Sequence, residues 1–165
     1  MKQLSFLLLV SVMLVVTGCP LQTNSPVDEG SYTETSWLEG KWDRQASRGS
    51  EGKSYVIKKH RKPGNILAYD VINGTTDSKG RLIVLSNIGS TIFISAFEDS
   101  DDLTDKGYYI YKMIKKSSTE FDLLPVKENS IAKNVSGKDI RAYLNKNQDA
   151  DIYEKKDIEH YKKNN

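Results

Sequence analysis

Few side chains in this 165-residue chain belong to the kinds that carry out catalysis. Its two histidines are His60, within a lysine-rich stretch, and His160, in a charged tail. Neither has a nucleophile or a set of metal ligands at a recognisable spacing. The sequence also contains no Gly-x-Ser-x-Gly turn and no phosphate-binding loop. We therefore expect a protein that is not an enzyme and that uses no cofactor.

A cluster of acidic residues could in principle bind Ca²⁺. Its members are Glu98, Asp99, Asp101, Asp102 and Asp105. An EF-hand loop needs oxygen ligands at alternate positions, an early glycine and a distal glutamate. Here Leu103 stands where an acid is needed, and Gly107 comes late. The pattern favours a solvated hairpin loop, and we predict no metal site.

A basic stretch is the counterpart of the acidic cluster. It consists of Lys53, Lys58, Lys59, His60, Arg61 and Lys62. Such a stretch could contact anionic lipid headgroups, at about 1 kcal/mol per charge near the surface, or an acidic partner, or could simply protect an edge strand from association. The whole chain is nearly balanced, with 24 Lys and Arg against 22 Asp and Glu. This balance argues against nucleic-acid binding, which needs a basic face.

The single cysteine, Cys19, follows an apolar run and therefore points to a role in export. Residues 4–16 (LSFLLLVSVMLVV) follow a basic start. At about 1.5 Å per residue a helix of that run covers roughly 20 Å, which is too short to span a bilayer but is typical of a signal peptide. One cysteine allows no intramolecular disulfide and no cysteine-based zinc site.

Residues 16–19 (Val-Thr-Gly-Cys) resemble the lipobox of bacterial lipoproteins. The resemblance implies cleavage between Gly18 and Cys19, a diacylglyceryl group on the Cys19 sulfur, and usually a further acyl chain on its amine. Two or more chains anchor a protein stably. Residues 1–18 are then the signal peptide and 19–36 a lipidated, flexible tether. Pro20 after the cysteine favours the outer membrane, facing the periplasm, and leaves the inner membrane open.

Residues 37–165 are predicted to form one mainly β domain. Short apolar or alternating runs are typical of strands, and they occupy 38–43, 55–57, 66–72, 82–85, 92–97, 108–114 and 121–126. Turn residues separate them at Asn73-Gly74, at residues 77–80 and at residues 87–90. The connections are too short for crossover helices, so we predict an antiparallel meander that forms a small barrel or a strongly curled sheet.

One helix is predicted near the C-terminus, at about 137–146. Ser136 and Asp139 form a capping pattern, and Ile140, Tyr143 and Leu144 follow at helical spacing. This helix could plug one end of a barrel or pack across the sheet. The stretch 150–165 is ambiguous, because residues 152–153 could add a strand while 153–163 could equally form a charged helix.

Residues 40–42 (Gly-Lys-Trp), which open the first predicted strand, resemble the Gly-x-Trp signature of lipocalins and related calycin barrels. Thr104-Asp105 with Tyr109 looks like that family's second motif, although Lys106 replaces the usual aromatic residue and no third-motif arginine precedes the helix. The resemblance implies a cavity for a small apolar ligand. Trp42, Tyr69, Tyr109 and Tyr111 could line it or pack in the core.

These observations favour a non-enzymatic, lipid-anchored envelope protein. Our first hypothesis is that its β domain binds a protein partner in the periplasm, which predicts an exposed apolar patch of more than a few hundred Å². A calycin-like carrier instead predicts an apolar cavity of roughly 300 Å³ or more. An inhibitor of an envelope hydrolase predicts a protruding loop.

Overall fold

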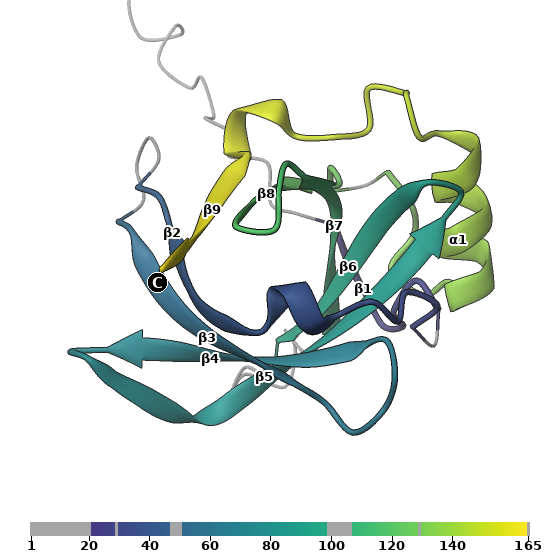
Figure 1. The fold of residues 1–165 in the computed structure, drawn as a ribbon. Coiled ribbons are helices and arrows are strands. Elements are labelled where there is room, and N and C mark those ends of the chain that lie inside the picture. The colour runs from purple at the N-terminus through teal and green to yellow at the C-terminus, as the bar shows by residue number, and fades with distance from the viewer. Residues whose placement is uncertain (1–20, 29, 47–50, 99–106, 129, 165) are drawn as a thin grey trace, which may run out of the picture.

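The fold is an eight-stranded antiparallel β-barrel with one helix packed on its outside (Figure 1). The computed structural model describes residues 21–28, 30–46, 51–98, 107–128 and 130–164. Around the barrel the strands follow the order β7-β6-β5-β4-β3-β2-β9-β8, and β8 pairs with β7 to close it. The prediction of a mainly β domain with an antiparallel meander is confirmed.

Seven barrel strands follow one another along the chain, and the eighth comes from the C-terminal tail. The seven are β2 (Gly40–Arg44), β3 (Lys53–Lys59), β4 (Asn65–Ile72), β5 (Thr75–Ile88), β6 (Thr91–Glu98), β7 (Gly107–Lys115) and β8 (Glu120–Pro125). β9 (Glu159–Asn164) pairs with β2 on one side and with β8 on the other. Neither expectation for the tail is right, because Tyr153 forms only an isolated bridge to Val126 and the strand lies farther on.

Two of the three predicted turns are present. Asn73 and Gly74 have φ values of 52° and 78° and connect β4 to β5, and Gly89 (φ 61°) lies between β5 and β6. Residues 77–80, however, lie within β5. Gly80 stands opposite Tyr69, and a Cβ atom on Gly80 would come within 2.8 Å of the Tyr69 ring. This glycine therefore makes room for an aromatic ring from the neighbouring strand instead of forming a turn.

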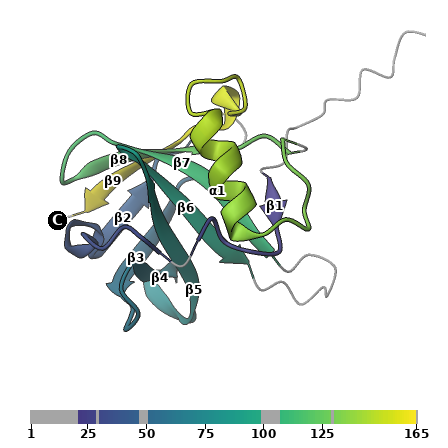
Figure 2. The same ribbon diagram turned by 90° about the vertical axis from the view of Figure 1, so that its right-hand side faces the viewer.

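Helix α1 (Gly137–Lys146) lies across the outside of the barrel (Figure 2). Its predicted cap is present, because the Ser136 side chain accepts a hydrogen bond from the Asp139 backbone N–H. Ile140 and Leu144 are fully buried, and each contributes about 1.5–3 kcal/mol by leaving water. They belong to an outer core, formed with residues of the barrel wall and the N-terminal segment: Leu21, Val27, Ile88, Phe93, Ile110, Leu124, Val126 and Tyr153.

The described residues before the barrel, 21–28 and 30–36, pack onto it, so this part of the predicted tether (residues 19–36) is not flexible. β1 (Gln22–Thr23) pairs with the start of β7, and Leu21 and Val27 are buried in the outer core. The turn η1 (Ser36–Leu38) then leads into β2. The low apolar content of this stretch hid the fact that its few apolar side chains are the ones that pack.

A second, inner core fills part of the barrel. It comprises Leu38, Trp42, Ile57, Ile66, Ala68, Leu85, Ile94, Met113, Phe121 and Leu123. Apart from Leu38 of η1, these residues alternate along their strands with residues of the outer face, as a pleated wall requires. The inner core is incomplete toward one end of the barrel, and that end holds the candidate site.

Candidate functional site in the barrel lumen

A cavity of about 190 Å³ lies inside the barrel, and all eight barrel strands contribute side chains to its wall. The apolar part of the wall consists of Ile57, Ala68, Ile83, Ile94, Ala96 and Leu123. The polar and aromatic part consists of Arg44, Lys53, Tyr55, Arg81, Tyr111, Glu159 and Tyr161. A concave space that joins an apolar wall to polar groups is a candidate small-molecule site.

Aromatic side chains close the lumen at the opposite end. Trp42 is fully buried, and its indole N–H donates a 2.7 Å hydrogen bond to the carbonyl of Leu38. The Trp42 ring contacts those of Trp37 and Phe121, with centroid distances of 6.1 and 4.7 Å. The ammonium group of Lys163 lies 5.5 Å from the Trp42 centroid and donates to the Trp37 carbonyl. Trp42 is therefore part of the plug, and the calycin-like Gly-Lys-Trp sequence begins the barrel at its closed end.

The open end of the lumen carries charged groups that are held in place by one another. Arg44 Nη1 donates to Glu159 Oε1 at 2.9 Å, and the Tyr161 hydroxyl donates to the second oxygen of Glu159 at 2.7 Å. Burial, together with the charge of Glu159, raises the pKa of Tyr161 well above its ordinary value, so this hydroxyl remains a donor at physiological pH. Across the opening, Arg81 pairs with Asp70.

The four aromatic residues predicted for a ligand site or core take different places. Tyr111 lines the cavity, and Trp42 belongs to the plug. Tyr69 lies on the outside of β4, where the Lys58 ammonium sits 5.1 Å from its ring centroid. Tyr109 is half-buried and pairs with Ala96 and with Gln22 of β1. Of the four, Tyr111 lines the cavity and Trp42 belongs to the plug, while Tyr109 shares the face of Tyr111 on β7 without being part of the cavity wall.

The basic stretch is divided by the geometry of β3. Lys53 opens this strand and Lys59 ends it, so about 20 Å separate them at roughly 3.3 Å per residue. Lys53 lines the cavity, whereas Lys58 faces outward over Tyr69. His60 accepts a hydrogen bond from the backbone N–H of Lys62 and belongs to the turn after β3. The six residues therefore do not form one surface.

The second histidine joins a charge cluster on the outer face of β8 and β9. His160 Nδ1 lies 2.7 Å from Asp122 Oδ1, and Lys116 Nζ lies 2.7 Å from the other Asp122 oxygen. Burial acts to raise the pKa of Asp122, but the hydrogen bonds from Lys116 and His160 outweigh it and lower the pKa below its ordinary value. Because Asp122 and His160 stand opposite each other, this contact fastens the closing strand to its neighbour.

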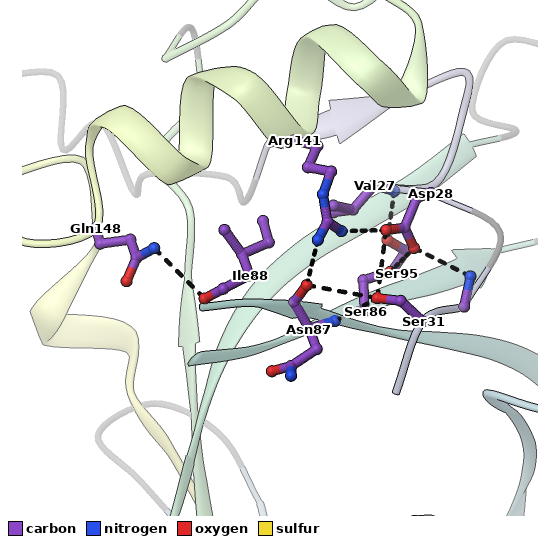
Figure 3. Close-up of polar contacts among 10 residues, drawn as sticks. Val27, Asp28, Ser31, Ser86, Asn87, Ile88, Ser95, Arg141 and Gln148 are labelled. Atoms are coloured by element: carbon purple, nitrogen blue, oxygen red, sulfur yellow. Dashed lines mark hydrogen bonds and ion pairs between the residues drawn. The ribbon is translucent and has the colours of Figure 1, made fainter. Parts of the chain in front are cut away.

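A polar clasp fastens the N-terminal segment and α1 to the barrel wall (Figure 3). Asp28 accepts hydrogen bonds from Arg141 of α1 and from Ser86 of β5. Arg141 also donates to the Asn87 carbonyl at 2.6 Å, and the Val27 N–H donates to the Ser95 hydroxyl at 3.0 Å. The clasp lies on the far side of the wall from the lumen. It therefore supports the shape of the barrel without contributing to the cavity.

Several predicted features lie outside the described residues. These are the lipobox with Gly18 and Cys19, Pro20, the Thr104-Asp105 motif, and the acidic cluster after Glu98. Within the described parts of the chain no group of three metal-ligating side chains comes together, and no helix there is long and apolar enough to cross a bilayer.

Sequence reasoning missed most of the lumen's polar groups. The strands predicted at 38–43 and 82–85 end or begin one residue away from two of these groups, Arg44 and Arg81. No strand is predicted at 159–164, which carries the other two, Glu159 and Tyr161. The alternation of Lys53, Tyr55 and Ile57 was the one available signal, since all three lie on the same face of β3. No protein-family model, curated protein or solved structure matches the chain.

Proposed function

We propose that the protein is a non-enzymatic carrier that holds one small molecule in its barrel lumen. The observation that supports this proposal is the cavity of about 190 Å³ walled by all eight strands. A core that only had to be stable would be expected to pack this end of the barrel with apolar side chains, as it does at the closed end. The calycin-like form of the barrel is compatible with this role.

The size of the cavity limits the ligand. At about 190 Å³ it does not reach the roughly 300 Å³ expected above for a calycin-like carrier, the size at which pockets for drug-sized ligands begin. A dry apolar cavity of about 150 Å³ is known to take up benzene. We therefore propose a ligand built on one ring or on a chain of similar size, and not a long acyl chain.

Binding of a protein partner through an apolar surface has less support. Among the described residues only two large apolar side chains are markedly exposed, Ile72 at 60% and Ile114 at 39%. Ile72 ends β4, next to the hairpin at the open end of the barrel, and Ile114 lies near the closed end of β7. Two separated side chains do not make an apolar docking patch.

Isoleucine methyl groups offer a direct test. The full chain, labelled at its isoleucine δ1 methyls and held in lipid nanodiscs, is titrated with benzamide, a neutral ring-sized probe. We expect saturable shifts at Ile57, Ile83 and Ile94, which line the lumen, but not at Ile110 and Ile140 of the outer core. Shifts that do not saturate, or that spare the lumen methyls, would contradict the proposal.

We further propose that an acylated Cys19 anchors this carrier in the cell envelope, with the outer membrane favoured over the inner. Leu21 is buried, and its N–H donates a 2.7 Å hydrogen bond to the Val126 carbonyl. Only Pro20 then separates the packed chain from Cys19, so the anchor would hold the barrel close to the bilayer. A Cys19→Ser variant should lose fatty-acid labelling and keep its leader. Normal labelling or cleavage of that variant would exclude this anchor.

Inhibition of an envelope hydrolase is the second candidate, because the β4–β5 hairpin reaches beyond the rest of the barrel (Figure 1). Residues 72–81 are all exposed, and Asn73-Gly74 forms the tight turn at its tip. Such a hairpin could enter an enzyme cleft. An inhibitor should lower lysozyme activity, and a variant with the tip residues 73–76 replaced by glycine and serine should not. Equal activity with and without the protein would exclude lysozyme as the target.

A further inference from the structure

The open end of the lumen brings charged side chains of both signs together. Among the described side chains, three cations line it, Arg44, Lys53 and Arg81, together with one carboxylate, Glu159. Asp70 pairs with Arg81 from beside the cavity. These charges lie at the end of the cavity where the wall changes from apolar to polar.

The carboxylate in the lumen is already engaged. One oxygen of Glu159 accepts from Arg44 at 2.9 Å and the other from Tyr161 at 2.7 Å. The side chains of Arg44 and Glu159 are only 16% and 24% exposed, so their interaction is screened less than that of a surface pair. Glu159 therefore neutralises Arg44 and does not neutralise a second cation at the opening.

Lys53 is the group that carries the uncompensated charge. It lines the cavity, and no carboxylate of the described residues lies within ion-pair distance of it. In the β2–β3 pairing Lys53 stands directly opposite Arg44, so both side chains project from neighbouring strands at the same level of the wall. An anion at this level would meet the Lys53 ammonium beside a guanidinium group.

Apolar side chains lie next to this charge, in a space that fits one ring. Ile57 is two positions after Tyr55 on the same face of β3, and Ile83 and Ile94 approach from β5 and β6. The cavity volume of about 190 Å³ is larger than the about 150 Å³ of a cavity that holds benzene. The difference is a little more than the roughly 30 Å³ that one water molecule occupies in the liquid. The difference accommodates one small head group.

Resting on the proposed carrier function, we propose that the natural ligand is a small organic anion. Its ring or short chain lies against Ile57, Ile83 and Ile94, and its carboxylate or similar monoanionic group lies at the opening beside Lys53. Arg44 and Arg81 are already paired with carboxylates, so Lys53 supplies the positive charge, while Tyr55 and Tyr161 provide flanking aromatic surface. A charge-assisted hydrogen bond is about twice as strong as a neutral one, so the head group contributes selectivity for anions.

Three planar probes of the same size test this inference. Benzoate, benzamide and benzamidinium have the same number of heavy atoms and carry charges of −1, 0 and +1 at pH 7. Titrations of the full chain in nanodiscs, followed at the lumen methyls, should show benzoate binding about tenfold more tightly than benzamide. Benzamidinium should bind more weakly than both, and added salt should weaken benzoate binding alone.

Two matched lysine variants complete the test. Lys53→Gln should remove most of the advantage of benzoate and leave the affinity for benzamide within about twofold. Lys58→Gln removes the same charge from the same strand but on the outer face, and it should change neither affinity. If benzamide binds and benzoate does not bind more tightly, the carrier function stands and the inference of an anionic ligand fails. If none of the three shifts the lumen methyls, both fail. Equal effects of the two variants would overturn the role of Lys53.

Discussion

Replacing Ala68 by phenylalanine should abolish ligand binding by filling the lumen from within. Ala68 is 8% exposed, lines the cavity and stands between Ile57 of β3 and Arg81 of β5 in the sheet. The added ring is the size of benzene, which occupies a cavity of about 150 Å³, so it takes up most of the 190 Å³ present here. We expect the affinity for benzamide to fall more than about tenfold.

The stability of this variant provides the check that it folds. Burial of a phenylalanine side chain contributes about 1.5–3 kcal/mol, and overpacking typically costs about 1–3 kcal/mol. Because these two effects offset each other, we expect the free energy of unfolding of Ala68→Phe to stay within about 1.5 kcal/mol of the parent value. In a fully packed core the same substitution would be destabilising, since no space would receive the ring.

The assay combines urea unfolding with benzamide titration of the labelled chain. The control is Ala142→Phe, which adds the same ring to the exposed side of α1 and should change neither property. A folded Ala68→Phe variant that still binds benzamide as the parent protein does would refute the assignment of the lumen as the binding site. Loss of stability by several kcal/mol would show that the cavity is not available to a ring.

Two other contacts allow equally specific predictions. Because the folded-state pKa of Asp122 lies below its ordinary value near 3.9, its ion pairs stabilise the fold fully above that pH, and the contribution is lost as the pH falls through the folded-state pKa. Urea unfolding of Asp122→Asn should therefore show a flatter decline in stability on acidification than the parent protein, and parallel curves would contradict this role. Arg141→Ala should lower the free energy of unfolding by about 1 kcal/mol, since the partly exposed pair with Asp28 is screened by solvent; hydrogen exchange should rise first in residues 21–31, and protection there equal to that of the parent would count against the clasp.

The C-terminal strand shows why the tail could not be assigned from sequence. In β9 the charged residues Glu159 and Lys163 face the lumen, while His160 and Lys162 face outward. Both faces therefore carry charge, and the alternation of apolar and polar residues that marks other strands is missing. The strand forms because two edges, those of β2 and β8, supply backbone partners. That condition exists only once the rest of the barrel has folded.

The N-terminal segment is the opposite case, because its polar composition predicts flexibility although the segment packs onto the barrel. Leu21 and Val27 are separated by five polar or proline residues, so no periodic pattern links them. Both are nevertheless buried against the outer core, and Asp28 is clasped by Arg141 from 113 positions away. Packing between segments so distant in the chain leaves no local signal.

The sequence by itself determined the strands from β2 to β8, the Asn73-Gly74 and Gly89 turns, and the capped helix at 137–146, because strand alternation, positive-φ turns and helix caps depend on residues close together in the chain. It also supplied the lipobox-like stretch that ends at Cys19, which remains a prediction. Tertiary structure alone decided that the sheet closes and that a cavity remains inside it. It alone placed Lys53, Arg81 and Glu159 around one opening, since residues up to 106 positions apart become neighbours only when the last strand joins the first.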